Sequence, residues 1–408
     1  MLKKNSNKRS RPKYEPDYPL QGSTLDLPIA EVLAFSKRRR EKYIDKLLVE
    51  FAKIIKKNEM ALKKRVPFRA EMRDLRKLVR LPYDRYLFLD ELTYKRNVLG
   101  KGSPGGTHTY WSRTLNWQMA TNSGDLPNDI AKKNAKLVKK LNRFLDSNYE
   151  GVFSLNRSKN KPVTTIQAIL SYLQVETHVG TAFPPFHARF LAEQFLPYDA
   201  DSLIIDPCAG WGGRLLGSLC VKRNHKVTYI GVDPEKRNED TYENLLGRVR
   251  KYLKREISGE RDMTIYYRPF EDWIISATAK RYMKKANLVV TSPPYFAAEV
   301  YNTENKKQSA NRYKTYSEWR DKFYYSLVKG AYDLLKPGGV FVLNISDVSS
   351  AKTLEKDARK LAREVGFKNA GFYKLAMSVA PGIRNALRHR VVVNGVEFKH
   401  EPVFCFRR

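Results

Sequence analysis

The chain has 408 residues and a formal net charge of +33, from 76 lysines and arginines against 43 acidic residues. This length is enough for two or three domains, and a hydrophobic fraction of 42% supports ordinary cores. Three cysteines are too few and too scattered for a disulfide scaffold or a zinc knuckle. A field of this sign attracts polyanions, so nucleic acid is the expected partner, although charge alone does not separate DNA from RNA.

The chain shows no signal for a membrane or for secretion. No apolar stretch approaches the length needed to span a bilayer, so no membrane contact is expected. The start of the chain is basic but lacks the apolar segment of a signal peptide. Together with the low cysteine count, this favours a reducing, intracellular location in the cytoplasm.

The first part of the chain is basic throughout. Residues 1–25 are polar and rich in Pro, Lys and Arg, and we expect a disordered arm. Residues 26–162 are predicted to be mainly helical, since apolar residues recur at mixed three and four spacing over 44–55 and 130–145. The charge run 37–40 is either a solvated helix face or a phosphate contact, and we favour phosphate contact slightly. We therefore predict a nucleic-acid-binding region here.

The segment Gly100–Gly106 is rich in glycine but is not a phosphate-binding P-loop. That motif ends in Gly-Lys-Ser/Thr and enters a helix, whereas here Pro104 and two further glycines follow. We interpret the segment as a flexible connector.

The sequence pattern changes in residues 163–408, where short apolar runs alternate with segments of helix length. The runs are 203–205, 227–232, 264–267, 287–290, 340–343 and 403–406. This alternation is typical of βαβ units and predicts an α/β domain with a doubly wound, mostly parallel sheet.

A glycine-rich turn follows the first of these runs, in the sequence DPCAGWGGR at 206–214. Glycines let the backbone bend sharply and let a ligand approach closely. Asp233 closes the next strand about twenty residues later, the spacing at which an acidic residue reaches ribose hydroxyls. A nicotinamide or flavin enzyme would share these features. However, the order Gly-x-Gly-x-x-Gly is not met, because Gly213 adjoins Gly212 and the next glycine is Gly217.

The most informative feature is the tetrapeptide Ser292-Pro293-Pro294-Tyr295, which follows the apolar run 286–290. The run is typical of a buried strand, and the double proline must end it in a stiff, extended turn. Such a turn presents a polar side chain, a carbonyl and an aromatic ring at the carboxyl end of a strand, where ligands bind in α/β sheets. This group suits a flat base with an amino group.

These motifs, in the order DPCAGWGG, Asp233, SPPY and LKPGG (335–339), resemble the class I S-adenosylmethionine-dependent methyltransferases. They are similar specifically to the branch that methylates exocyclic amino groups of DNA bases, the adenine-N6 and cytosine-N4 enzymes, in the γ motif order. The resemblance covers residues 165–408, and EPVFCF (401–406) is similar to that family's final strand. It implies a seven-stranded methyltransferase sheet, S-adenosylmethionine as cofactor and double-stranded DNA as the expected substrate.

Carried over by position, the resemblance implies a set of cofactor-binding residues. They are Phe183, Asp206, Cys208, Ala209, Gly210, Gly212, Asp233, Pro234 and Asp272. The first aspartate and the two glycines would line the methionine portion, and Asp233 would bind the ribose hydroxyls. Asp272 would contact the adenine amino group, although the neighbouring Glu271 leaves the register open. Phe183 lies in a segment that would pack over the cofactor, and His178 and His187 nearby are interpreted as surface or capping residues.

The resemblance also assigns the catalytic residues, Ser292, Pro293, Pro294 and Tyr295. An exocyclic amine must rehybridise before it attacks a methyl sulfonium, and two acceptors on its N–H bonds favour that geometry. The Ser292 side chain and the Pro293 carbonyl are the candidate acceptors, while Tyr295, or less favourably Phe296, would stack on a base that is flipped out or single-stranded. No metal and no covalent nucleophile are required.

Three questions stay open at this point. A serine at position 292 leans towards cytosine N4 without excluding adenine N6. An RNA base amino-methyltransferase is an alternative, since some tRNA guanine-N2 enzymes share a Pro-Pro-Tyr turn, and so is an inactive nucleic-acid-binding protein with this fold. The polar loop 299–317 either contacts substrate or is a surface insertion, and the arginine-containing segment 377–397 is similar in kind.

Overall fold

The computed structural model describes the following residues: 27–28, 36, 38–39, 68–100, 104–105, 154–156, 161–164, 182–298, 300–301, 305–377 and 389–408. The predicted arm at 1–25 and the basic helices at 44–55 and 130–145 lie outside these ranges, as does most of the segment 377–397. Those interpretations stay predictions.

The chain divides into two compact units, Met1–Leu62 with Val138–Tyr172, and Lys63–Leu137 with Leu173–Arg408. In the described residues of the first unit, short strands form an antiparallel sheet in the order β1-β5-β4. They are β1 (Leu27–Pro28), β4 (Ser154–Asn156) and β5 (Lys161–Thr164). The helical pattern of 26–162 does not anticipate them, because strands this short give no alternating run.

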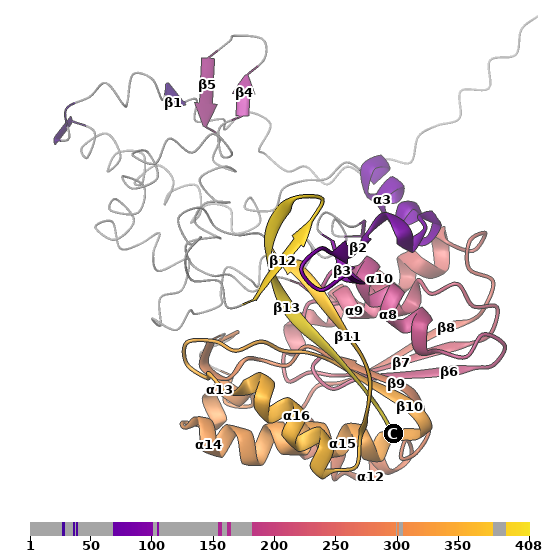
Figure 1. Ribbon diagram of the computed structural model, residues 1–408. Coiled ribbons are helices and arrows are strands. Elements are labelled where there is room, and N and C mark those ends of the chain that lie inside the picture. Colours follow the sequence, from indigo (N-terminus) through magenta and orange to yellow (C-terminus); the bar gives the residue numbers. More distant parts are fainter. Residues whose placement is uncertain are drawn as a thin grey trace, which may run out of the picture. The chain divides into compact units, whose positions relative to one another are not determined.

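The second unit is built on a mixed, mostly parallel sheet (Figure 1). Among the described residues it has ten strands, in the order β2-β3-β11-β13-β10-β9-β6-β7-β8, with β12 paired to β13. They are β2 (Leu87–Asp90), β3 (Lys95–Leu99), β6 (Ser202–Asp206), β7 (Val227–Val232), β8 (Arg261–Tyr266), β9 (Ala286–Thr291), β10 (Leu335–Asn344), β11 (Lys368–Met377), β12 (Arg390–Val393) and β13 (Val396–Arg407). The α/β prediction is confirmed. The count of seven strands is wrong, because β2, β3 and β12 extend the sheet.

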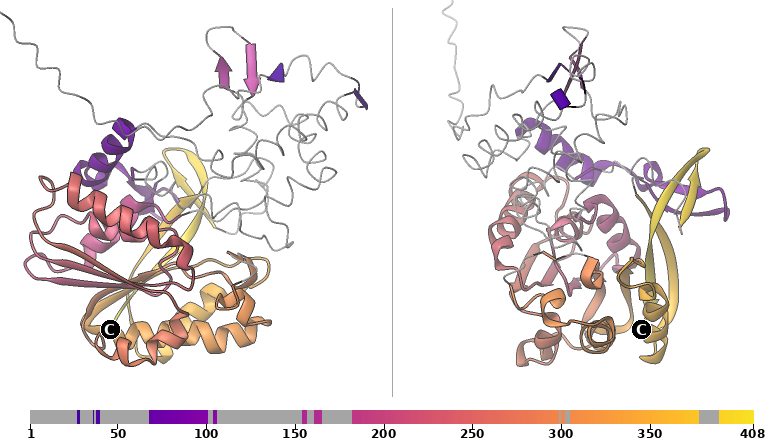
Figure 2. Two further views of the ribbon diagram at one scale, coloured as in Figure 1. Left: turned by 180° about the vertical axis from the view of Figure 1, so that it is seen from behind. Right: turned by 90° about the vertical axis from the view of Figure 1, so that its left-hand side faces the viewer.

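Helices cover both faces of this sheet, and each face buries a hydrophobic core. Helices α3 (Phe68–Arg80), α8 (Pro185–Phe195), α9 (Gly213–Leu219) and α10 (Glu239–Tyr252) share one core. The second core takes α11 (Phe270–Ile274), α12 (Ala277–Lys280), α15 (Tyr325–Leu334) and α16 (Leu354–Glu364). Figure 2 shows these two layers from behind and from the side. None of the helices within the described ranges is long and apolar enough to cross a bilayer.

Side chains of β9 alternate between the two cores, as the period of a strand requires. Leu288 and Val290 join the core under α8 and α9, whereas Val289 joins the core under α15. Because β9 is buried on both faces, 286–290 reads as a continuous apolar run in the sequence.

The remaining short helices are η1 (Tyr83–Arg85), η4 (Lys236–Asn238), η5 (Phe296–Ala298), α13 (Ser309–Arg312), α14 (Tyr316–Trp319) and the π-helix η6 (Arg320–Tyr324).

The hairpin β2–β3 brings residues from before position 163 into the same sheet as the C-terminal strands. Strand β3 runs parallel to β11, and the Glu91 N–H donates to the Val392 carbonyl at 2.9 Å, which links the end of β2 to β12. A small core of its own fills the space between these strands: Val98, Ala376, Val391 and Val393. Inside it, the buried Asp90 pairs with the Lys374 ammonium group. This extension places the residue after β3, Gly100, beside the cavity described next.

Candidate active site

A cavity of about 460 Å³ opens at the carboxyl ends of β6, β7, β9 and β10. This is the edge at which ligands bind in open α/β sheets. Several of the predicted site residues line it: Phe183, Cys208, Ala209, Gly210, Asp233, Pro234, Ser292, Pro294 and Tyr295. Four others lie outside its wall: Asp206, Gly212, Asp272 and Pro293. Within the described residues, no group of three or more His, Cys, Asp or Glu could hold a metal ion.

Asp206 lies behind the glycine-rich turn after β6 and holds it in place. Its carboxylate is fully buried and accepts hydrogen bonds from Arg214 Nε at 2.7 Å and from the Tyr229 hydroxyl at 2.8 Å. The same carboxylate accepts from the Cys208 N–H at 3.1 Å. Asp206 therefore shapes the turn instead of lining the cavity, whereas its partner Arg214, which was not among the predicted site residues, does line it.

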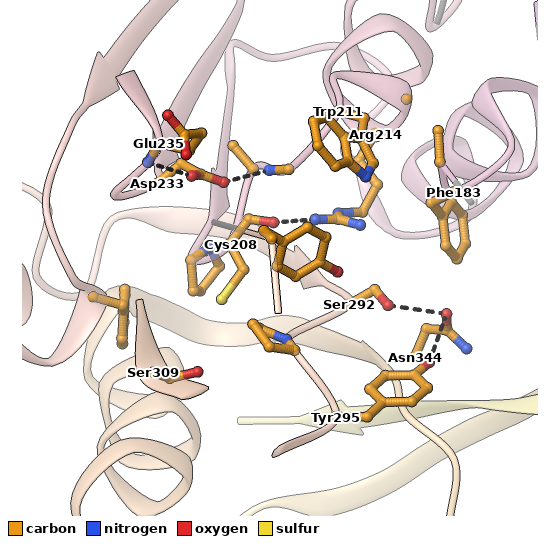
Figure 3. Close-up of a pocket in the computed structure, with 18 of the residues that line it drawn as sticks. Phe183, Cys208, Trp211, Arg214, Asp233, Glu235, Ser292, Tyr295, Ser309 and Asn344 are labelled. Atoms are coloured by element: carbon orange, nitrogen blue, oxygen red, sulfur yellow. Dashed lines mark hydrogen bonds between the residues drawn. The ribbon is translucent and has the colours of Figure 1, made fainter. Parts of the chain in front are cut away.

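Asp233, which follows β7 (Figure 3), joins the turn after β7 to the turn after β6 through a bond to Gly210. Gly210 has a φ of 60°, and its N–H donates to Asp233 Oδ2 at 2.7 Å. The other carboxylate oxygen of Asp233 accepts from the Glu235 N–H at 2.8 Å. The Gly210 carbonyl accepts from the Tyr242 hydroxyl at 2.5 Å and from Asn238 Nδ2 at 3.1 Å. Burial raises the pKa of Asp233 to about 7, although the two backbone N–H groups oppose that shift.

Cys208 lies in the same wall but is poorly suited to nucleophilic attack. Burial raises the pKa of its thiol, and the nearby carboxylates of Asp206 and Asp233 raise it further. A nucleophilic cysteine needs the thiolate form, which this surrounding disfavours. The chemistry therefore leaves Cys208 as a wall residue.

At the start of α11, Glu271 and Asp272 point in different directions, and the one that lines the cavity is not the predicted one. Glu271 lines the cavity, whereas Asp272 is turned away and accepts from Arg312 Nη1 at 2.9 Å and Nη2 at 3.1 Å. The Tyr313 hydroxyl donates to Glu271 at 2.8 Å. Of this pair, Glu271 and not Asp272 therefore lines the cavity.

The tetrapeptide after β9 forms the opposite end of the cavity (Figure 3). The Ser292 hydroxyl donates to Asn344 Oδ1 at 3.2 Å. The Tyr295 hydroxyl can donate to the same oxygen at 3.3 Å or to Glu401 Oε2 at 3.2 Å. Asn344 is itself fixed, since its Nδ2 donates to the Pro402 carbonyl at 3.0 Å. The turn is therefore held by side chains from the ends of two other strands, β10 and β13.

The predicted loop after the tetrapeptide packs against the first end of the cavity. Tyr301 makes an edge contact with Trp211 at 5.6 Å between ring centroids. The Asn305 side chain donates to the Pro234 carbonyl at 3.0 Å, and Lys307, Gln308, Ser309 and Ala310 line the wall. In its described residues the loop thus contributes directly to the site and is more than a surface insertion.

The C-terminal strands carry a family match. Residues 286–407 match the family model N6_N4_Mtase, described as DNA methylase. This C-terminal region of the chain is therefore similar to the N6/N4 DNA methylases. The protein is accordingly an S-adenosylmethionine-dependent enzyme that methylates an exocyclic amino group of a DNA base.

Solved structures resemble this DNA methyltransferase at low similarity. An O-methyltransferase from Thermotoga maritima is 13% identical with a TM-score of 0.32, over 61% of this chain and 75% of the other. Magnesium protoporphyrin IX methyltransferase from Synechocystis is 9% identical with a TM-score of 0.33, over 55% of this chain and 79% of the other. Neither likeness bears on the substrate of this chain. No curated protein matches.

The cavity fits S-adenosylmethionine at the end formed by the turns after β6 and β7. Asn238 Oδ1 and Ser309 Oγ are buried polar atoms without a hydrogen-bond partner among the described residues, and both residues line the cavity. Buried polar atoms of this kind are rare unless a ligand or water satisfies them. Together with Asp233 and Glu271, they supply the acceptors and donors that an adenosine with its hydroxyls and amino group requires.

Two residues of the methyltransferase depart from their sequence interpretation. His187 is not on the surface but fully buried, and its Nε2 donates to the Gly100 carbonyl at 2.6 Å. Burial lowers the pKa of His187 to about 4, so the ring is neutral and structural. Gly100, interpreted as the start of a flexible connector, instead ends the β2–β3 hairpin and lines the cavity.

Proposed function

We propose that this DNA methyltransferase acts on a base rotated out of double-stranded DNA, with cytosine N4 as the preferred target. Ser292 accepts one N–H bond of the exocyclic amine, and the carbonyl of Pro293, which lies between the wall residues Ser292 and Pro294, is proposed to turn to the cavity and accept the other. The observation that carries this assignment is the 3.2 Å hydrogen bond from the Ser292 hydroxyl to Asn344 Oδ1. Because that bond uses the hydroxyl proton, the lone pairs of Ser292 are left to accept from the substrate.

The two acceptors act on the geometry of the amine. Its lone pair is delocalised into the ring, and acceptors placed along both N–H bonds favour the rehybridised nitrogen that can attack. As the new N–C bond forms, the nitrogen gains positive charge, which the same acceptors stabilise. Pro293 and Pro294 hold the backbone rigid, so little reorganisation is needed during the step.

The cofactor lies, in this proposal, across the turns after β6 and β7. S-adenosylmethionine supplies the electrophilic methyl group. Asp233 and Asn238 would accept from the ribose hydroxyls, Ser309 would bond to the adenosine, and Glu271 would accept from the adenine amino group. Asp206 and Gly212 support the turn from behind, through the ion pair with Arg214 and a φ of 82° that favours glycine.

Tyr295 is the proposed stacking partner of the base. Its ring is 8% exposed, and its hydroxyl is held near Asn344 and Glu401, so the ring has a fixed orientation. A base stacked within a duplex cannot reach an active-site cavity, which is why flipping is part of the proposal. The net charge of +33 supplies the phosphate contacts, and we assign the grip on the duplex to the basic residues of 26–162.

The test is to incubate unmethylated, amplified DNA of mixed sequence with the protein and labelled S-adenosylmethionine, then to identify the modified nucleoside by mass spectrometry. The expected product is N4-methylcytosine. If the product is N6-methyladenine, methylation of an amino group in DNA stands and the target base is adenine instead of cytosine. Label in RNA but in no DNA would favour the RNA alternative, and no label in either would contradict catalysis.

A further inference from the structure

A carboxyl group lies in the wall of the cavity at the end where the target base is proposed to bind. Glu401 is on β13 and lines the cavity together with Ser292, Tyr295 and Asn344. Its Oε2 accepts from the Tyr295 hydroxyl at 3.2 Å. Asn344 in turn connects Tyr295 to Ser292, through distances of 3.3 and 3.2 Å to its Oδ1. Glu401 therefore belongs to the same network as the group proposed to bind the amine.

The ring atom next to the exocyclic amine differs between bases in its hydrogen-bonding character. In cytosine it is N3 and in adenine N1, and both carry a lone pair that accepts. In guanine the carbon that carries the amine is bonded to two ring nitrogens, N1, which carries a proton and donates, and N3, which accepts. A protonated carboxyl group donates a hydrogen bond, whereas a carboxylate only accepts. A protonated carboxyl group at this place therefore pairs with cytosine N3 or adenine N1 and disfavours a guanine whose N1–H faces it.

We propose that Glu401 is a specificity-determining residue, whose protonated carboxyl group donates to the ring nitrogen beside the amine held by Ser292. The inference rests on the proposed role of Ser292. It explains how the site accepts cytosine or adenine and disfavours a guanine bound with its N1–H towards the donor. In this proposal the Tyr295 hydroxyl also orients the Glu401 carboxyl group, by donating to its Oε2.

The surroundings of Glu401 support the protonated form. Burial raises the pKa of its carboxyl, and the charge of Glu355 on α16 acts in the same direction. Lys399 on the same strand and the hydrogen bonds from Tyr295 and Asn344 oppose the shift without reversing it. Lys374, on the neighbouring strand β11, is already paired with Asp90.

The experiment compares Glu401→Gln and Glu401→Ala with the wild type, using unmethylated duplex DNA and following kcat/KM from pH 6 to pH 9. Glutamine keeps an N–H donor at every pH and an oxygen for Tyr295. We expect it to retain most of the activity and to depend less on pH than the wild type does. Alanine removes the donor and should lower kcat/KM by roughly tenfold to a hundredfold. Glu397→Gln, on the exposed part of the same strand and paired with Arg390, is the matched control.

The binding constant for S-adenosylmethionine, measured by calorimetry, shows whether each variant is folded, and it should change less than about twofold. An alanine variant as active as the wild type would overturn the inference and leave the proposed function standing. So would a glutamine variant that loses activity as alanine does. A wild type that methylates no DNA base would overturn both.

Discussion

The two ends of the cavity are built by different means. At the cofactor end, backbone groups do most of the work. The Gly210 N–H and the Glu235 N–H are both held by Asp233, at 2.7 and 2.8 Å. At the base end, side chains from three strands hold one another, with Asn344 accepting from Ser292 and from Tyr295. A backbone turn can be recognised from a short contiguous motif, whereas a network of side chains from separate strands cannot.

The largest effect is expected at the base end. Ser292→Ala removes one of the two proposed acceptors and should lower kcat by roughly a hundredfold to a thousandfold, the range for a lost transition-state hydrogen bond. The affinity for S-adenosylmethionine should stay within about twofold of the wild type, because the residue is at the opposite end. Single-turnover methylation and calorimetry measure the two quantities.

The exposed Ser258→Ala is the matched control for that substitution, since its hydroxyl lies on the surface beside Asn224. A comparable loss of cofactor affinity in Ser292→Ala would show that the two ends of the cavity are not separate. An unchanged kcat would remove Ser292 from the catalytic role.

Much of the fold and half of the site could be predicted from the sequence. Strands β6, β7 and β9 and the turns that follow them are contiguous in sequence, and each was recognised from a run and a motif. Asn344 and Glu401 were missed as site residues because their position depends on the register of β13 against β10, in which Asn344 pairs with Val403. No local pattern encodes that register.

A second error of the sequence prediction concerns two neighbouring residues in one turn of helix. Glu271 and Asp272 are adjacent, and the sequence could not decide which of them faces the ligand. Contacts made by residues far along the chain separate them, because Arg312 binds both oxygens of Asp272 while Glu271 also receives the Tyr313 hydroxyl and lines the cavity. Likewise, α8 is buried over most of its length, so His187 faces the interior although its neighbours in the sequence gave no such sign.

At the cofactor end, the expected effect is a change in binding that depends on pH. The pKa of Asp233 in the free protein is about 7, raised by burial, so the carboxylate that should accept from ribose is only partly formed near neutrality. Affinity for S-adenosylmethionine should therefore rise by about tenfold between pH 6 and pH 8. Asp233→Asn should bind more weakly and lose this dependence, while kcat at saturating cofactor changes little.

The Asp233 carboxyl group also affects the stability of the fold, which should fall as the pH rises, whereas cofactor affinity should increase. A carboxyl group with a raised pKa in the folded state stabilises the protein below its ordinary pKa, and that contribution is lost as the pH rises towards 7. The thermal midpoint without cofactor should therefore fall between pH 5 and pH 8 by more in the wild type than in Asp233→Asn. A wild-type affinity that does not vary with pH would contradict the role of Asp233.

The smallest effect is expected where the loop after the catalytic turn reaches the cofactor end. Ser309 is 7% exposed, and its hydroxyl has no hydrogen-bond partner within the described residues. If it bonds to the adenosine, Ser309→Ala should weaken cofactor binding by about threefold to tenfold, the effect of one neutral hydrogen bond. Ser317→Ala, on the exposed side of α14, is the control. If Ser309→Ala instead lowered kcat at saturating cofactor, this loop would act on the base end, and the division between the two ends would no longer hold.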